Sequence, residues 1–454
     1  MHTHDLIVIG AGMAGINAVG RAVGDGRRIA LVERGRFGGT CPTRGCIPSK
    51  ALIRSAEIAH EARRAAEFGI RVGSVEVDFG AVMTRVRDII DKGSNGARKY
   101  VQSLDGVEIV DGEATFTGPD AIAVDGRELS APTIVIATGA DPTVPPIPGL
   151  DRVPHWTSDD LLLRVTELPR RLVMIGAGPI ALELGQAMAR LGSQVTIVEV
   201  APRMLPAAEP EISDMLRSYL TDEGIEILTG VEIVQVRSGP QIAIRHEGVD
   251  RTITADALLV ATGRGPALDA LALDHTGVEA NHKGIAVDGH LQTTQPGVYA
   301  AGDVVGLPYG AFTPVARRMG VSVAENALGL RPHDVDTDVG PTAIFTDPEL
   351  ASVGLTEAAA REAGHDVAVG TANFTGGKAR AWGEERGMTK VIVDRPTRRI
   401  LGAHILAYHG ADLIHTPAVA MNAPRGSVDP ILATMHIHPT LGEVVLSAAQ
   451  RAAG

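Results

Sequence analysis

Two segments of the chain repeat one pattern of strand, glycine turn, helix, strand and acid, and this repeat constrains the fold most strongly. The first copy reads DLIVIGAGMAG over residues 5–15, and the second reads RLVMIGAGPIA over residues 171–181. A helical stretch follows each turn, and then an apolar strand that ends in Glu33 or Glu199. The first turn glycine and the acid are 23 residues apart in both copies (33 − 10 and 199 − 176). The spacing predicts two Rossmann-like, dinucleotide-binding domains.

The turn positions have three separate physical roles in such a fold: tight turning, close approach of the backbone to a pyrophosphate, and packing of the helix on the strand. In that order they are Gly10 and Gly176, Gly12 and Gly178, and Gly15 and Ala181. The helix that follows offers free N–H groups and a positive dipole end to phosphates. The two acids at the strand ends are suited to accept hydrogen bonds from ribose hydroxyls. The alternative, a glycine turn in an ordinary βαβ unit, is disfavoured by two matched copies.

A second repeated sequence, Ala-Thr-Gly after a buried strand, lies at the end of each copy. A buried strand that ends in Ala-Thr-Gly leads to Gly139 in one copy and to Gly263 in the other. Ahead of these strands, Asp125-Gly126 and Glu247-Gly248 are hairpin signals. The proline-rich residues 141–149 predict a stiff linker between the two copies.

These features predict an α/β protein of four segments. The expected boundaries are a first dinucleotide-binding domain over 1–145, a second over 146–266, a central segment over 267–337 and a C-terminal domain over 338–454. The central segment carries an Ala-Gly-Asp sequence that ends at Asp303. Strands and helices alternate in the last segment, as in α+β domains. We expect strands there over 390–394 and 400–405, and helices over 356–363 and 411–421.

Two cysteines stand just after the first acid, in the segment GGTCPTRGCIPSK over residues 38–50. A pair spaced as Cys41 and Cys46 at a helix start can bring its sulfurs within bonding distance. The helix dipole and Lys50 are expected to lower the pKa of both thiols. A metal site is disfavoured, because no further cysteine completes a thiolate set and His60 lies too far along the helix. A redox pair and plain structural cysteines are the two remaining interpretations.

Composition excludes several function classes. The chain of 454 residues has a net charge of −12, and an acidic chain repels phosphate backbones, which disfavours nucleic-acid binding. No apolar run approaches the ~18–20 residues of a membrane span. The start of the chain lacks the basic region of a signal peptide, and two cysteines make no secreted disulfide framework. We expect a cytoplasmic protein that binds neither nucleic acid nor membrane.

The cysteine segment resembles the redox motif of the class I pyridine nucleotide–disulfide oxidoreductases. The resemblance covers essentially the whole chain, including both glycine turns, both Ala-Thr-Gly strands, AGD at 301–303 and HPTLGE over 438–443. Within the family it is closest to dihydrolipoyl dehydrogenase, on the Pro-Ser-Lys ending, on Glu199 and on FTDPELASVGLT over 345–356. It implies FAD and NAD as cofactors, a C-terminal dimerisation domain, a homodimer and a lipoyl-bearing protein as substrate.

The same resemblance implies roles for single residues. The first fold, from Gly10 to Glu33, would hold the ADP half of FAD, and the second would hold the nicotinamide dinucleotide. Cys41 would be the interchange thiol and Cys46 the thiol against the flavin. Further residues implied at the FAD site are Lys50 beside the flavin N5 and paired with Glu183, and also Ala114, Gly139, Asp303 and Ala311. His438, oriented by Glu443, would be the acid/base that reaches in from the partner subunit.

Some positions depart from the family pattern. Pro42-Thr43 stands where an apolar residue and Asn are usual, and the following Arg44 is expected to favour thiolates. Residues 312–316 look more like glutathione reductase. That enzyme is disfavoured because the 2′-phosphate of NADPH would meet Glu199, and mercuric reductase because its extra C-terminal cysteines are missing. A reductase of another disulfide (glutathione-, mycothione- or mercuric-reductase-like) and a mainly structural flavoprotein subunit remain alternatives.

Two weaker groups are predicted to have no role in the site. Glu61, Arg63 and Arg64 are expected to form one solvated helix face. His404, His409 and His415 lack ligand spacing and are expected at the surface or at an interface.

Overall fold

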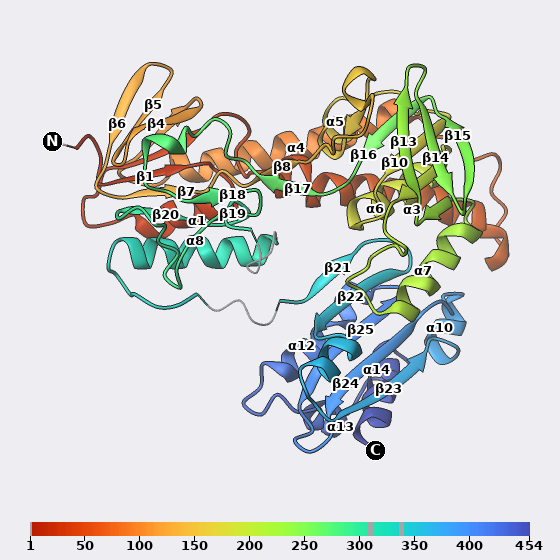
Figure 1. Ribbon diagram of the computed structural model, residues 1–454. Coiled ribbons are helices and arrows are strands. Elements are labelled where there is room, and N and C mark those ends of the chain that lie inside the picture. Colours follow the sequence, from red (N-terminus) through yellow and green to blue (C-terminus); the bar gives the residue numbers. More distant parts are fainter. Residues whose placement is uncertain (1, 307–311, 336–339) are drawn as a thin grey trace.

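The first repeat copy builds a five-stranded parallel sheet in the order β20-β7-β1-β2-β3. The computed structural model describes residues 2–306, 312–335 and 340–454. The strands of this sheet are β1 (Leu6–Ile9), β2 (Ile29–Glu33), β3 (Val107–Asp111), β7 (Ile134–Ile136) and β20 (Val298–Ala300). Helix α1 (Met13–Ala22) packs against α8 (Thr313–Ala327) beside the sheet (Figure 1). Strand β20 and helix α8 come from the central segment, so that segment is part of the first domain's core.

The second copy builds a matching parallel sheet in the order β12-β11-β10-β16-β9. Its strands are β9 (Trp156–Thr157), β10 (Arg171–Ile175), β11 (Gln194–Glu199), β12 (Glu226–Thr229) and β16 (Ala257–Val260). Helix α6 (Pro179–Leu191) follows the second glycine turn, and α7 (Pro210–Asp222) precedes β12. The inner strands β1, β7 and β16 are apolar and buried along their whole length, as expected for the centre of a parallel sheet.

Antiparallel hairpins extend each copy. They are β4-β5-β6 (Ala114–Gly118, Ala121–Val124, Arg127–Ser130) and β13-β14-β15 (Glu232–Arg237, Gln241–His246, Val249–Thr254). The turns predicted at Asp125-Gly126 and Glu247-Gly248 are confirmed, because each joins two paired strands. The proline-rich linker begins as a strand, β8 (Ala140–Pro142), which pairs with β17 (Arg264–Pro266) and so ties the ends of the two Ala-Thr-Gly strands together.

Helices connect the two copies. The cysteine segment forms α2 (Thr40–Arg44) and the long α3 (Cys46–Arg64), which ends in a 3-10 turn (Ala65–Phe68). Helix α4 (Phe79–Gln102) packs against α3, and α3 packs against α6 of the second copy. A short helix, α5 (Ser158–Leu163), begins with a capping box in which Thr157 and Asp160 exchange hydrogen bonds. Short elements complete this part: Leu150–Arg152, Leu273–His275, β18 (Ala280–Asn281) and β19 (Gly284–Ile285).

The C-terminal segment is an antiparallel sheet in the order β21-β22-β25-β24-β23, drawn in blue in Figure 1. Its strands are β21 (Thr342–Ile344), β22 (Glu349–Gly354), β23 (Val367–Asn373), β24 (Met388–Asp394) and β25 (Ile400–Ala407). Helix α14 (Gly442–Ala453) packs on β23 and β24. The remaining helices are α9 (Glu357–Glu362), α10 (Gly377–Trp382), α11 (Gly410–Leu413), α12 (His415–Met421) and α13 (Asp429–Ala433).

One predicted helix of this segment is wrong. Residues 411–421 form two short helices, α11 and α12, with Ile414 between them. Pro417 has no N–H to donate to the carbonyl of Leu413, so an unbroken helix would lose a hydrogen bond at this point.

A buried ion cluster joins the C-terminal domain to the second copy. Lys390 Nζ lies 2.9 Å from Glu209, 2.6 Å from Glu211 and 2.8 Å from Glu357. The side chains of Lys390 and Glu209 are each only 3% exposed. His404, predicted at the surface or an interface between chains, is instead buried here; it bonds Ser352 Oγ and the Leu355 carbonyl at 3.0 Å. Because β25 is the central strand of its sheet, its side chains point into packed surroundings.

None of the helices in the described ranges combines the length and the apolar character needed to cross a membrane.

Candidate active site

A cavity of about 880 Å³ lies at the carboxyl ends of the first sheet. The sequence-predicted residues that line it are Gly10, Gly12, Glu33, Cys41, Cys46, Ala114, Gly139 and Asp303. Parallel sheets place ligands at this edge, beside the N-terminus of the helix after the first strand. Burial raises the pKa of Asp303, and the nearby Arg264 partly opposes this. The structure therefore gathers these predicted FAD residues and the two cysteines around one space, whereas Lys50 does not line it.

The glycine turns have the same geometry in both copies. Gly10 has φ of +105° and Gly176 has φ of +100°. This backbone conformation is strained for a residue with a side chain and free of strain for glycine. A Cβ at Gly10 would lie 2.4 Å from the carbonyl oxygen of Ala137, and one at Gly176 would lie 2.7 Å from that of Ala261. Each turn thus packs against the Ala of its own Ala-Thr-Gly strand. This close approach leaves the helix N-terminus open, which fits the binding of a dinucleotide at each turn.

The two acids fix the turns that precede them. Glu33 accepts hydrogen bonds from the N–H groups of Ala11 and Gly35, both at 2.7 Å. Glu199 repeats this arrangement with Ala177 at 2.6 Å and Ala201 at 2.8 Å. Each carboxylate is therefore held in place at the end of its strand, where the ribose of a bound dinucleotide lies in such folds.

The remaining predicted residues of the second copy lie at the start of α6 and after strand β16. Gly178 is the N-cap of α6, Ala181 is buried in its first turn, and Gly263 follows the closing strand β16. In the first copy, Gly15 does not line the cavity. It packs against the turn instead, because a Cβ at Gly15 would lie 1.9 Å from the carbonyl oxygen of Gly10. Ala311, the last predicted FAD residue, lies outside the described residues.

The cysteines are free thiols with opposite pKa shifts. A hydrogen bond from Cys41 is the largest effect on Cys46 and, with Thr313 and Lys50, lowers the pKa of Cys46 to about 6. The same hydrogen bond and burial raise the pKa of Cys41 well above its ordinary value. The expectation that both thiols are acidified is therefore wrong for Cys41, because only one thiolate can be stabilised by its neighbour. Cys46 also stands at the first position of α3, where the helix dipole favours an anion.

Lys50 connects three parts of the chain. Its Nζ lies 2.7 Å from Glu183 Oε2 on α6, as predicted. It also lies 4.2 Å from the ring centroid of Phe345, at the start of the C-terminal domain. Glu183 in turn accepts a hydrogen bond from the N–H of Phe345 at 2.9 Å. Lys50 is thus held by the buried carboxylate of Glu183, which belongs to the second Rossmann copy and is fixed by the backbone of the C-terminal domain.

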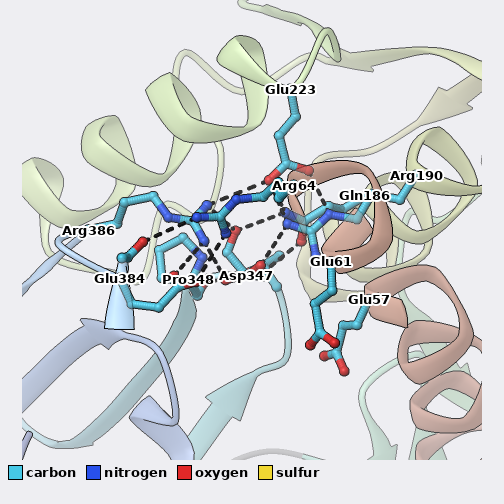
Figure 2. A network of polar contacts seen from close by, with 12 residues as sticks. Glu57, Glu61, Arg64, Gln186, Arg190, Glu223, Asp347, Pro348, Glu384 and Arg386 are labelled. Carbon is cyan, nitrogen blue, oxygen red and sulfur yellow. Dashed lines mark hydrogen bonds and ion pairs between the residues drawn. The ribbon is translucent and has the colours of Figure 1, made fainter. Parts of the chain in front are cut away.

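A second set of contacts continues along the same face of α6 (Figure 2). Gln186 exchanges hydrogen bonds with the backbone of Asp347 at 2.8 and 2.9 Å. Arg190 lies 2.7 Å from the Asp347 carboxylate and 2.6 Å from Glu223. Burial pushes the pKa of Asp347 up, but the guanidinium groups of Arg386 and Arg190 together bring it below its ordinary value. Positions 183, 186 and 190 therefore fasten the C-terminal domain to the helix that also holds Lys50.

The end of α3 joins this network, which corrects the expectation of a solvated helix face. Arg64 bonds Glu384 at 3.0 Å and the carbonyl of Gly383 at 3.2 Å, and Arg63 bonds the carbonyl of Arg190. Only Glu61 of the predicted face remains mostly exposed.

The same region contains a group with metal-ligand character. His60, Glu223 and Asp347 place ligand atoms within 4.8 Å of one another. Both carboxylates are already paired with arginines, and these cations oppose the binding of another one. Among the described residues this group is therefore an ion-pair network, and we assign no metal site to it.

His438 and Glu443 lie in the C-terminal domain, away from the cysteines of their own chain. His438 Nδ1 bonds Glu443 Oε1 at 2.9 Å, and Glu443 Oε2 accepts a hydrogen bond from the N–H of Thr440. The bonds from Thr440 and His438 lower the pKa of Glu443. The His438 side chain is 77% exposed, and neither residue lines the cavity. Within one chain, the predicted acid/base and the thiols are not brought together.

Sequence reasoning missed two residues at the cysteines. Thr313 Oγ1 lies 3.7 Å from Cys46 Sγ; it contributes to the lowered pKa of Cys46 and partly opposes the rise in the pKa of Cys41. Gly39, with φ of +67°, packs so closely that a Cβ would lie 2.6 Å from the Cα of Gly12. The signals were present in the quoted motifs, since Thr313 follows Phe312 and Gly39 precedes Thr-Cys.

Comparison with known proteins gives consistent results. The family model of the pyridine nucleotide-disulphide oxidoreductases matches residues 4–327, and the model of their dimerisation domain matches residues 340–449. A mercuric reductase of Bacillus cereus is 37% identical over 92% of the chain and 67% of its own length. A dihydrolipoyl dehydrogenase of Chlorobaculum tepidum is 38% identical over 98% and 96%. Among solved structures, a Cu(II) complex of the HOCl-induced flavoprotein disulfide reductase RclA of Escherichia coli has a TM-score of 0.88, at 30% identity over 99% of both chains.

Proposed function

The chain belongs to the class I pyridine nucleotide–disulfide oxidoreductase family, and we propose that it acts as a dihydrolipoyl dehydrogenase. Membership makes it a flavoprotein disulfide oxidoreductase that binds FAD and a pyridine nucleotide and carries a dimerisation domain. The finer proposal names NAD⁺ as oxidant and protein-bound dihydrolipoyl groups as substrate. Its support is the acidified Cys46 beside Cys41 and Lys50, together with Glu199 at the second turn.

The proposed reaction begins at the Cys41–Cys46 disulfide. The partner subunit's His438 takes a proton from the dithiol substrate, and Glu443 holds the imidazole and stabilises its cation. The substrate thiolate attacks the Cys41 sulfur, which forms a mixed disulfide and releases Cys46 as a thiolate. The second substrate thiol then displaces Cys41, so the substrate leaves as a disulfide and Cys41 takes a proton.

The chain's own groups favour this sequence of steps. A sulfur with a low pKa is the better leaving group, and Thr313 and Lys50 lower the pKa of Cys46 independently of the Cys41 thiol. Lys50 and Thr313 stabilise the thiolate that forms there. FAD held in the cavity lined by Gly10, Glu33 and Asp303 would supply an acceptor for the two electrons of the reduced pair and a source of hydride for NAD⁺.

The proposal is tested by steady-state turnover of the FAD-loaded enzyme. We expect oxidation of dihydrolipoamide with NAD⁺ to be far faster than reduction of glutathione disulfide with NADPH. Hg²⁺ with NADPH is the third substrate pair, because a mercuric reductase is as similar in sequence as the dihydrolipoyl dehydrogenases. Faster turnover with glutathione disulfide and NADPH, or with Hg²⁺ and NADPH, would contradict the proposed substrate and identify the faster one as the substrate.

Glu199 is expected to set the choice of nucleotide. Its carboxylate is fixed by Ala177 and Ala201, and a 2′-phosphate placed against it meets like charge, which costs several kcal/mol. We predict a preference for NAD⁺ over NADP⁺ of at least ~100-fold in kcat/KM. Glu199→Gln keeps the side chain's size and removes its charge. The ratio of kcat/KM with NAD⁺ to kcat/KM with NADP⁺ should therefore fall by ~10-fold or more. Equal kcat/KM for the two nucleotides in the unmodified enzyme would show that Glu199 does not set the preference.

A further inference from the structure

Arg44 stands between the two cysteines and forms ion pairs with two carboxylates of other segments. It is the last residue of α2, and its Nη1 lies 3.1 Å from Asp141 Oδ1 and 3.3 Å from Asp159 Oδ2. Asp141 belongs to β8, the strand that joins the two Rossmann copies, and Asp159 lies in the first turn of α5. The segment between the cysteines is therefore tied to two elements about 100 residues away (141 − 44 = 97 and 159 − 44 = 115).

Each of these carboxylates is shared with one further arginine. The second oxygen of Asp141 lies 3.1 Å from Arg34, and that of Asp159 lies 2.9 Å from Arg264. Arg264 also donates to the carbonyl of Ala140 at 2.7 Å, and its side chain is only 13% exposed. Hydrogen bonds from Arg34 and Arg264 hold each carboxylate on the side away from Arg44, so the two carboxylates that Arg44 pairs with are themselves fixed in place.

This pairing changes the role expected of Arg44. Its expected effect as a cation that favours thiolates is weakened, because its charge is matched by two carboxylates. Arg44 instead fixes the end of α2, two residues before Cys46. Asp159 and Arg264 are only 14% and 13% exposed, so the contact of Arg44 with Asp159 is better shielded from water than a surface ion pair, whereas Asp141 is 40% exposed.

We propose that Arg44 is a positioning residue for the redox pair, which fixes α2 against β8 and α5 and so holds the Cys41 and Cys46 sulfurs close together. The inference rests on the proposed dithiol–disulfide chemistry but not on the identity of the substrate. Forming the disulfide joins the two sulfurs and releases two protons and two electrons to an oxidant. Sulfurs held close together have a high effective concentration toward each other, which favours the disulfide. Arg44 therefore keeps the reduction potential of the pair more negative than that of an unrestrained pair.

The test measures the thiol–disulfide equilibrium of the holoenzyme in dithiothreitol redox buffers. Samples are quenched with an alkylating reagent, and the number of alkylated thiols per chain is determined by mass spectrometry. Because the chain has two cysteines, this number distinguishes the dithiol from the disulfide directly. We expect Arg44→Ala to favour the dithiol about tenfold, a shift of about 30 mV to less negative potential. Arg44→Lys should shift it less than Arg44→Ala does, because both contacts of Arg44 run through Nη1 alone and a lysine keeps one charged nitrogen there.

Asp159→Asn separates positioning from charge. If Arg44 acted only by its charge, removing the cation and removing the anion would shift the potential in opposite directions. Positioning predicts a less negative potential in both variants. Arg54→Ala is the matched control, because Arg54 lies exposed on α3 with partners on its own helix and should leave the potential unchanged. A potential that stays unchanged or becomes more negative in either Arg44→Ala or Asp159→Asn overturns the proposal.

The outcome is independent of the substrate assay. Failure to oxidise dihydrolipoamide would contradict the proposed substrate and still leave the potential measurable. Circular dichroism and FAD content establish that each variant is folded, and the nearly isosteric Asp159→Asn keeps the test valid if Arg44→Ala is not folded.

Discussion

Cys41→Ser is expected to show a long-wavelength charge-transfer band in the oxidised holoenzyme without any reductant. In this variant Cys46 stays as a free thiol that cannot form the disulfide, and Lys50 and Thr313 favour its thiolate. The proposed order of the sulfurs places that thiolate against the flavin. Cys46→Ser should lack the band, because it removes the sulfur that the proposed order places against the flavin. Both variants should lose turnover, since neither can form the disulfide.

The band should also depend on pH in a defined direction. In the reduced wild-type pair the pKa of Cys46 is lowered to about 6, so the thiolate dominates above that pH and is protonated below it. The band of the two-electron-reduced enzyme should therefore weaken as the pH falls through about 6. Absorbance recorded over a pH series checks this. A band in Cys46→Ser and none in Cys41→Ser would reverse the assignment of the thiols.

The repeated dinucleotide folds could be predicted from sequence because their signal is local. A glycine forced to positive φ, a helix start and an acid at a fixed spacing all lie within one βαβ unit. The structure adds that Glu33 and Glu199 bond the turn backbone itself, so the acid also supports the turn. The Lys50–Glu183 pair spans 133 residues and was available only through the family resemblance.

The residues that sequence reasoning placed wrongly are those whose surroundings come from distant segments. Arg63 and Arg64 look like a solvated helix face until the C-terminal domain is packed against them. His404 shows no sign of burial in its own segment, yet it lies beside Glu209, which is 195 residues away (404 − 209). The raised pKa of Cys41 depends on which of two coupled thiols donates the hydrogen bond, and spacing alone does not determine this.

The dimer is expected to be essential, since His438 and the thiols are separated within one chain. His438 is exposed near the end of the C-terminal domain, close in sequence to the residues Ile437 and Met435, which are 78% and 95% exposed. Large apolar side chains left in water at this level favour burial by a partner. A two-fold dimer would then give two equivalent sites, each with thiols from one subunit and His438 with Glu443 from the other.

Complementation between two inactive homodimers tests this arrangement. We would co-express Cys46→Ser and His438→Ala chains with different tags and purify the heterodimer. If sites are shared, one site of the heterodimer contains both lesions and the other contains neither, so about half of the wild-type activity per dimer returns. If each site is built within one chain, every site contains one lesion and activity stays lost. The doubly substituted chain, Cys46→Ser with His438→Ala, paired with a wild-type chain is the matched control. It distributes one lesion to each shared site and should be inactive, whereas unshared sites would leave it half active.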